Sequence, residues 1–288
     1  MQQSPSISLH GNGRVKPAAF AYVRPRALEE ACEILAGSDG ARLIAGGQSL
    51  GPMLNLRLVR PETLVDIAQL DELTWIEEGD SSWRIGAGVT HAELEDCEEL
   101  LACAPMLAEV AAGIAYRSIR NLGTVGGALA HADPAADWPL ALAALDATVQ
   151  VRGRGGQARR VKADRFMRSA FTTDLEDAEV IEFVDVPKHG RSYGYCKFCR
   201  KEGEYPQASA AAVLDRGTGV LRVFIGALGG APQPLSALAA DLARAGQSVA
   251  TKQAVRAAVA EAAPDLDALG TSMHAAIVAR AISQAFAA

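Results

Sequence analysis

Residues 44–58 of the 288-residue chain read IAGGQSLGPMLNLRL, and residues 119–137 read IRNLGTVGGALAHADPAAD. Each stretch gathers glycine and other small residues where a predicted strand or helix meets a loop. Glycine lets backbone N–H groups converge on one point and lets a ligand approach with no Cβ in the way, which is how phosphate oxygens are bound. The hydroxyl groups of Ser49 and Thr124 add two donors. Both segments are therefore candidates for holding an anion, although tight turns alone explain either one.

The spacing of the glycines excludes the common nucleotide-binding turns. No Gly-Lys-Ser/Thr follows either segment, as a P-loop requires, and neither has the Gly-x-Gly-x-x-Gly of a Rossmann turn. A P-loop or standard NAD-binding interpretation is disfavoured.

An acidic segment, HADPAADW, follows at residues 131–138. Asp133 before Pro134 is typical of a helix N-cap. Asp137, expected one turn into that helix, would face the same neighbourhood as the glycine loop and is placed to accept a hydrogen bond from a ribose or an amide.

The rest of the chain predicts two successive blocks of secondary structure. In the first block, strands and helices alternate. Its expected elements are a helix ending near 36, strands at 41–45, 63–67, 73–76 and 83–89, a helix capped by Thr90, helices at 100–114 and 134–145, and a hairpin at 147–162. In the second block, four strands (180–186, 193–200, 208–214 and 220–228) precede three helices (235–245, 249–262 and 272–287). Strands followed by helices predict a separate α+β domain, with a boundary near 172–180.

Composition narrows the class of protein. The chain has 28 Lys+Arg against 34 Asp+Glu, a net charge of −6, and five cysteines. No apolar stretch approaches 18 residues, and residues 1–16 lack the apolar core of a signal peptide, so a cytoplasmic protein without a membrane span is expected. An odd number of cysteines fits a reducing compartment. The acidic balance argues against nucleic acid binding, and the RGRGG at 152–156 fits a solvated hairpin turn.

In this order and spacing, the two glycine-rich stretches resemble the FAD-binding medium subunit of the molybdenum hydroxylases, the family of xanthine dehydrogenase, carbon monoxide dehydrogenase and quinoline oxidoreductase. Two shorter segments agree, IGAGVTH at 85–91 and KFCRKEGEY at 197–205. The resemblance spans about residues 17 to 235, and the total length matches a separate medium subunit.

The resemblance implies an α+β fold with two domains. Residues 1–177 would form an FAD-binding domain of the vanillyl-alcohol-oxidase type, made of two α+β halves that divide near 55–62. Residues 178–288 would form a sheet-plus-helices domain like that of the carbon monoxide dehydrogenase flavoprotein.

The same resemblance implies the residues that contact FAD, but no catalytic residue and no metal ligand in this chain. The FAD diphosphate would be wrapped by Leu43, Ile44, Ala45, Gly46, Gly47, Gln48, Ser49 and Leu50. A second phosphate and ribityl contact would come from Gly123, Thr124, Gly126 and Gly127. The remaining expected contacts are His131 beside the loop, Asp137 near the adenosine end, Ile181 against the ring system, and Lys197 and Tyr205 near the isoalloxazine.

One residue departs from the family pattern, and two sets of residues could be mistaken for metal or cluster ligands. Relatives usually carry a bulkier residue before Pro52 than Gly51, which would alter the wall behind the phosphate loop. Cys196 and Cys199 lie three apart on a strand and point to opposite faces, and an iron–sulfur cluster would need four cysteines. His91 and His131 have no further ligands at metal-binding spacing, so His91 is expected to be a loop or helix-start residue.

The implied function is electron transfer. Substrate would be oxidised at a molybdenum cofactor in a large subunit, and electrons would pass through two [2Fe-2S] clusters of a small subunit to the FAD of this chain. The substrate would be an N-heterocycle, a purine-like compound, an aldehyde or carbon monoxide, and the assembly a dimer of heterotrimers. Two alternatives remain open: a self-sufficient flavin oxidoreductase of similar fold, and a scaffold subunit without cofactor.

Overall fold

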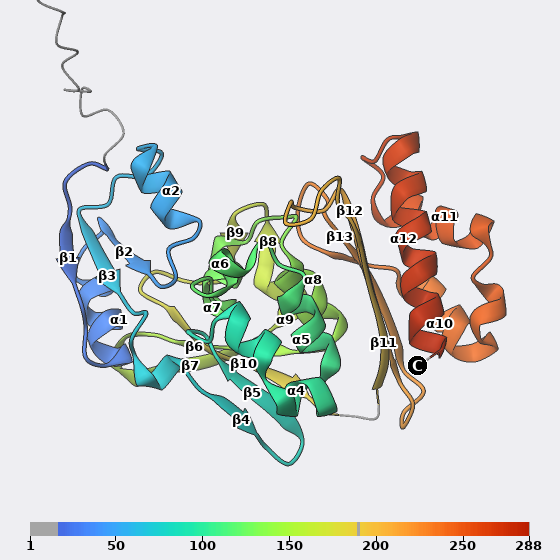
Figure 1. The fold of residues 1–288 in the computed structure, drawn as a ribbon, viewed down its shortest axis with the longest axis horizontal. Coiled ribbons are helices and arrows are strands. Elements are labelled where there is room, and N and C mark those ends of the chain that lie inside the picture. The colour runs from blue at the N-terminus through green and yellow to red at the C-terminus, as the bar shows by residue number, and fades with distance from the viewer. Residues whose placement is uncertain (1–16, 189–190, 288) are drawn as a thin grey trace, which may run out of the picture.

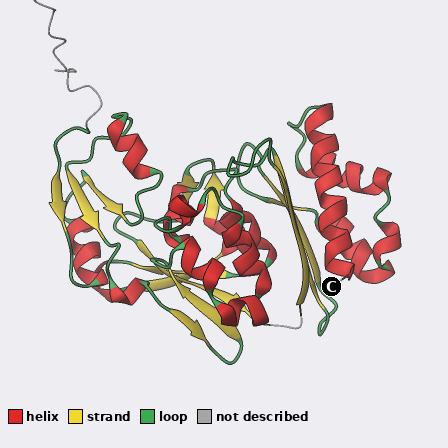
Figure 2. Cartoon of the chain, viewed as in Figure 1, coloured by secondary structure: helices red, strands yellow, loops and turns green. Residues whose placement is uncertain are grey.

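The computed structural model describes residues 17–188 and 191–287. They form three larger sheets and a two-stranded one, with helices packed around them, running from the blue N-terminal end in Figure 1 to the orange and red C-terminal helices. Figure 2 shows the same arrangement by element type. The expectation about a leader at residues 1–16 lies outside the described part of the chain.

The first sheet carries the first glycine segment. Its three parallel strands, in the order β1-β3-β2, are β1 (Ala21–Val23), β3 (Thr63–Asp66) and β2 (Ala41–Ile44), and they are accompanied by α1 (Leu28–Ala36) and α2 (Leu50–Asn55). β2 therefore ends just before the two glycines, Gly46 and Gly47, and α2 begins just after Ser49. β3 pairs with both neighbours, so this sheet extends through Asp66, a few residues beyond the division expected near 55–62.

The second sheet has five antiparallel strands in the order β4-β5-β10-β6-β7. They are β4 (Ile76–Glu78), β5 (Ser82–Gly86), β10 (Val180–Pro187), β6 (Thr148–Arg152) and β7 (Ala158–Lys162). We expected residues 180–186 to join the C-terminal strands, and this was wrong. β10 lies at the centre of the second sheet, with Val184 paired to Ile85 on one side and to Val149 on the other.

Short helices between β5 and β6 carry the second glycine segment. They are α3 (His91–Asp96), α4 (Glu98–Cys103), α5 (Pro105–Ala112), α6 (Arg117–Arg120), α7 (Val125–His131) and α8 (Asp137–Ala144). The capping box at Thr90 and Glu93 is confirmed. The single helix expected at 100–114 is two helices, because Pro105 has no N–H and starts α5.

Two other expected elements differ in the structure. The strand expected at 73–76 is a 3₁₀ turn (Asp71–Leu73) followed by β4. The last helix of this group begins at Asp137 with Ala136 as its N-cap. Asp133 is therefore not the cap, and its carboxylate instead accepts a hydrogen bond from the Ala135 N–H, at 2.9 Å, within the preceding turn. Small elements, α9 (Ala163–Phe166), β8 (Met167–Ser169) and β9 (Thr172–Thr173), lead toward β10.

The C-terminal sheet lies between two groups of helices. Its strands are β11 (Arg191–Phe198), β12 (Ala208–Asp215), β13 (Leu221–Gly226) and β14 (Gln233–Pro234). Along β12, Ala210 and Ala212 pack in the core made with α10 (Ser236–Ala245), α11 (Lys252–Ala262) and α12 (Ala268–Ala287), whereas Ala211 and Val213 belong to the core of the preceding domain. Because successive side chains of a strand point to opposite faces, the sheet packs against a hydrophobic core on each of its two faces. Within residues 17–188 and 191–287, no helix has both the length and the apolar character needed to cross a membrane.

Candidate functional site

The two glycine-rich segments touch each other. A Cβ added to Gly46 would lie 1.6 Å from the carbonyl oxygen of Leu122 and 3.0 Å from the α-carbon of Gly123. Only glycine at position 46 permits this approach. Gly46 and Leu122, 76 residues apart in the sequence, therefore bring the two segments into one surface.

The first segment presents a row of backbone donors. Among the described residues, no hydrogen-bond acceptor is paired with the N–H groups of Gly46, Gly47, Gln48, Ser49 and Leu50. Gly47 has a φ of 68°, which turns the chain as glycine allows. From Gly51 onward the N–H groups return to helical bonding, beginning with the bond to the Gly47 carbonyl at 2.8 Å. These donors are free to bind an anion.

The second segment uses most of its donors internally. The N–H groups of Val125 and Gly126 donate to Val89 and Ala87, at 3.1 and 2.8 Å. The Gly127 N–H donates to the Thr124 Oγ1 at 3.0 Å, which caps α7. Near the cap, Gly127 is exposed, and the Thr124 hydroxyl keeps a hydrogen that it can donate. The second segment therefore packs against the first, and the N–H groups of its residues 125–127 are not available to a ligand.

A buried histidine stands behind the second segment. His91 is 4% exposed, and its Nδ1 accepts a hydrogen bond from the Trp138 indole at 3.2 Å. Burial, and secondarily the positive charge of Arg120, lower the pKa of His91 to about 4, so the ring is neutral near pH 7. The sequence analysis treated His91 as a loop or helix-start residue. It does begin α3, but its burial against a tryptophan 47 residues away carried no local signal.

Asp137 is engaged by the C-terminal domain. It is buried, and its Oδ1 accepts hydrogen bonds from the Tyr195 hydroxyl at 2.5 Å and from the Lys197 Nζ at 2.8 Å. Lys197 also donates to the Gly113 carbonyl at 2.7 Å. Burial, and then the charge of Asp137, raise the pKa of Tyr195 well above its usual value. Asp137 and Lys197 were expected separately as FAD contacts, but neither their contact with each other nor the part of Tyr195 was predicted from the sequence.

The three remaining residues expected to contact FAD, His131, Ile181 and Tyr205, differ from one another in position and burial. His131 is at the end of α7 remote from Thr124, with its ring 5.3 Å from that of Phe171. Ile181 is buried in the core beside a bulge in β10. Tyr205 is 57% exposed, on the loop between β11 and β12.

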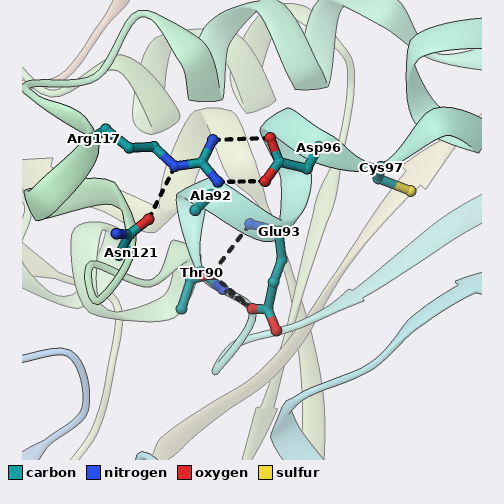
Figure 3. A pocket seen from close by; sticks show the side chains of 7 residues that line it. All are labelled: Thr90, Ala92, Glu93, Asp96, Cys97, Arg117 and Asn121. Carbon is teal, nitrogen blue, oxygen red and sulfur yellow. Dashed lines mark hydrogen bonds and ion pairs between the residues drawn. The ribbon is translucent and has the colours of Figure 1, made fainter.

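A shallow pocket opens beside the start of the second segment, and Figure 3 shows that its charged groups face one another. Arg117 donates to Asp96 with both terminal nitrogens and to the Asn121 Oδ1 at 2.9 Å. Thr90 and Glu93 satisfy each other as a capping box. The polar contacts that line the pocket thus connect α6 to α3 and hold Asn121 in place just before the glycines of the second segment.

The described residues offer no alternative metal chemistry. No group of three or more His, Cys, Asp or Glu side chains within 17–188 and 191–287 is close enough to hold a metal ion. All five cysteines are free, and Cys196 lies 3.2 Å from the Gln284 amide oxygen.

Comparison with known proteins identifies the family of the chain. Residues 18–189 match the family described as the FAD binding domain in molybdopterin dehydrogenase. The carbon monoxide dehydrogenase medium chain of Hydrogenophaga pseudoflava is 37% identical over 94% of this chain and 98% of its own length. The 6-hydroxypseudooxynicotine dehydrogenase complex subunit alpha of Paenarthrobacter nicotinovorans is 41% identical over 75% of this chain and 74% of its own length.

A solved structure extends the likeness to the whole fold. The crystal structure of quinoline 2-oxidoreductase from Pseudomonas putida 86 contains a chain that superimposes with a TM-score of 0.87 at 34% identity, covering 94% of this chain and 98% of that one. The matched family, the relatives and the superposition together place this oxidoreductase chain among the FAD-binding medium subunits of the molybdenum hydroxylases.

Proposed function

We propose that this chain carries FAD as the electron-transfer subunit of a heterotrimeric molybdenum hydroxylase. It would accept electrons from the [2Fe-2S] clusters of a small subunit and pass them to a terminal acceptor, while a large molybdenum subunit hydroxylates the substrate. The observation that carries the proposal is the row of five N–H groups at Gly46–Leu50 that have no acceptor within residues 17–188 and 191–287, on a segment packed against the second glycine segment.

The donor set fits a dinucleotide diphosphate. Diphosphate oxygens are anionic acceptors, and successive backbone N–H groups before a helix are the donors that such groups favour. The contact of Gly46 with Leu122 is a backbone-to-backbone approach that leaves no room for a side chain at position 46. Bound FAD would supply the ability to take up electrons singly and release them in pairs. The work of the chain is to hold and orient the cofactor.

We assign the halves of the cofactor site as follows. Residues 43–50 hold the diphosphate, and Thr124 and Gly127 approach the phosphate and ribityl portions. His131, Ile181 and Tyr205 are kept as proposed contacts farther along the cofactor, and Asp137 and Lys197 as a pair near it. We also propose that residues up to Pro187 form an FAD domain of the vanillyl-alcohol-oxidase type, since β10 completes its second sheet.

The relatives favour an N-heterocycle as the substrate class of the complex. They include the nicotine 6-hydroxylase medium subunit of Paenarthrobacter nicotinovorans and the caffeine dehydrogenase subunit beta of a Pseudomonas species. Purine-like compounds and aldehydes belong to the same proposal. The substrate would be selected in the large subunit, and the complex would be a cytoplasmic dimer of heterotrimers.

The test has two parts. The purified 288-residue chain should be yellow and release one FAD on denaturation, and a colourless chain that cannot be reconstituted with FAD would refute the proposal. Co-purification with its partner subunits should then give a complex containing molybdenum and iron, whose flavin absorbance bleaches when substrate is added without oxygen. Bleaching of the flavin by substrate in the isolated chain would instead support a self-sufficient oxidoreductase.

A further inference from the structure

The His91 imidazole is held in one orientation by a buried tryptophan. Trp138 is 1% exposed and donates from its indole Nε1 to the His91 Nδ1 at 3.2 Å. Because Nδ1 accepts this bond, the neutral ring carries its hydrogen on Nε2. The bond therefore fixes both the tautomer and the direction in which the far edge of the ring points.

That far edge lies against Gly123. A Cβ at position 123 would be 3.1 Å from both the Cδ2 and the Nε2 of His91, tighter than ordinary van der Waals contact. The His91 backbone N–H also donates to the Gly123 carbonyl at 2.9 Å. His91 thus fixes Gly123 through both its side chain and its backbone.

Gly123 in turn lies against the first glycine segment. Its α-carbon is 3.0 Å from the position that a Cβ of Gly46 would take. Trp138, His91, Gly123 and Gly46 therefore form a column that runs from the buried helix α8 to the loop with the unpaired N–H groups. Close-packed contacts of this kind transmit a displacement at one end to the other.

We propose that His91 is a positioning residue for FAD. By packing against Gly123, it fixes the distance between Gly123 and Gly46, and so the spacing of the two glycine segments around the diphosphate. The inference rests on the proposed role of this chain in holding FAD. The ring acts through Gly123 and needs no contact of its own with the cofactor.

The experiment measures the dissociation constant of FAD for the full-length chain freed of flavin, and the visible circular dichroism of the flavin at saturation. His91→Leu keeps the apolar volume but leaves the Trp138 N–H without an acceptor. We expect FAD binding to weaken about tenfold and the dichroism of the bound flavin to change. His91→Asn returns an acceptor near the position of Nδ1, so it should bind within about threefold of the wild type and restore the dichroism.

A second buried histidine provides the matched control. His274 is fully buried, with its ring nitrogens 2.9 and 3.0 Å from the carbonyls of Gly270 and Gly226 in the C-terminal domain. His274→Leu should lower thermal stability but leave the dissociation constant of FAD and the flavin dichroism unchanged.

The outcomes separate this inference from the proposed function. A folded His91→Leu that binds FAD as tightly as the wild type, with the same dichroism, overturns the inference, as does an equal loss in His274→Leu. If His91→Leu does not fold, Trp138→Phe removes the indole donor, together with part of the ring volume, and is judged by the same two measurements. A wild-type chain that binds no FAD refutes the proposed function, and the inference with it.

Discussion

The α-carbon of Gly46 lies directly against the carbonyl oxygen of Leu122, so that a Cβ at position 46 would come within 1.6 Å of that oxygen. The obstructing atom belongs to the backbone and cannot rotate away. The contact joins the loop that follows β2 of the first sheet to a loop between β5 and β6 of the second sheet. Its consequences can be measured one residue at a time.

Gly46→Ala should separate the two glycine segments. Relief of such a clash requires backbone movement and typically costs about 1–3 kcal/mol, so FAD affinity should fall between about fivefold and about 150-fold. The measurement is the flavin-to-protein ratio and the dissociation constant of FAD. Gly51→Ala is the matched control, since a Cβ there meets no atom within 4 Å. Equal flavin retention in both variants would contradict the proposed contact site.

Thr124→Ala should weaken both the fold and the cofactor site. The Thr124 Oγ1 caps α7 by accepting from Gly127, and loss of a cap costs about 1 kcal/mol. Thr251→Ala removes an equivalent cap from α11, where Thr251 accepts from Ala254 at 3.2 Å. Urea denaturation should show similar losses in the two variants, but only Thr124→Ala should reduce FAD affinity. A loss of affinity in Thr251→Ala as well would assign the effect to stability alone.

Asp137→Ala should destabilise the contact between the two domains. It would leave the largely buried Lys197 ammonium without its carboxylate and Tyr195 without an acceptor, and breaking a buried pair in this way costs about 3–5 kcal/mol. Arg244→Ala removes an exposed ion pair with Asp241 and should cost less than about 1 kcal/mol. Denaturant titration compares the two. Similar losses would mean that the Asp137 cluster contributes no more than a surface pair.

The stability of the protein should depend on the protonation of His91. Unfolded His91 takes up a proton below its ordinary pKa of 6.5, whereas the folded ring does so only below about 4. Folding must therefore expel a proton between these values, and the free energy of unfolding falls as the pH is lowered from 6.5 to 4, by about 3 kcal/mol in total from this group. His91→Asn should lack this component in urea titrations at pH 7 and pH 4.5. An identical pH dependence in the variant would show that folding does not lower the pKa of His91.

The cysteines should differ sharply in reactivity. Cys32 is fully buried, and burial raises the pKa of its thiol to about 11, whereas Cys103 is exposed. Since the thiolate is the reactive species, alkylation at pH 7.5 should modify Cys103 first and Cys32 only after denaturation. Peptide mapping by mass spectrometry identifies the order. Early modification of Cys32 would mean that α1 opens in the native protein.

The glycine segments could be predicted from the sequence because glycine is required locally, by a positive φ at Gly47 and by close approach at Gly46. The hairpin of β6 and β7 and the C-terminal helices also followed from local pattern. The Pro105 break was visible in the sequence but was overridden by the apolar periodicity around it.

The rest depended on partners far away in the chain. Nothing near residue 180 indicates that β10 pairs with β5 and β6, because an apolar strand has the same pattern in either domain. The burial of His91 depends on Trp138, and Asp137 meets a lysine 60 residues later. Side chains that satisfy one another across such distances leave no periodic signal.

The central place of β10 also bears on how the chain is made. During synthesis, β4 with β5, and β6 with β7, emerge as two separate hairpins, each with an unpaired edge where β10 will later insert. Exposed strand edges invite pairing with other chains, so a nascent or truncated chain that stops before Val180 is an aggregation hazard. The cofactor domain is completed only by residues made after both glycine segments have left the ribosome. Synthesis thus delivers both glycine segments before the strand that joins β5 to β6 in the second sheet.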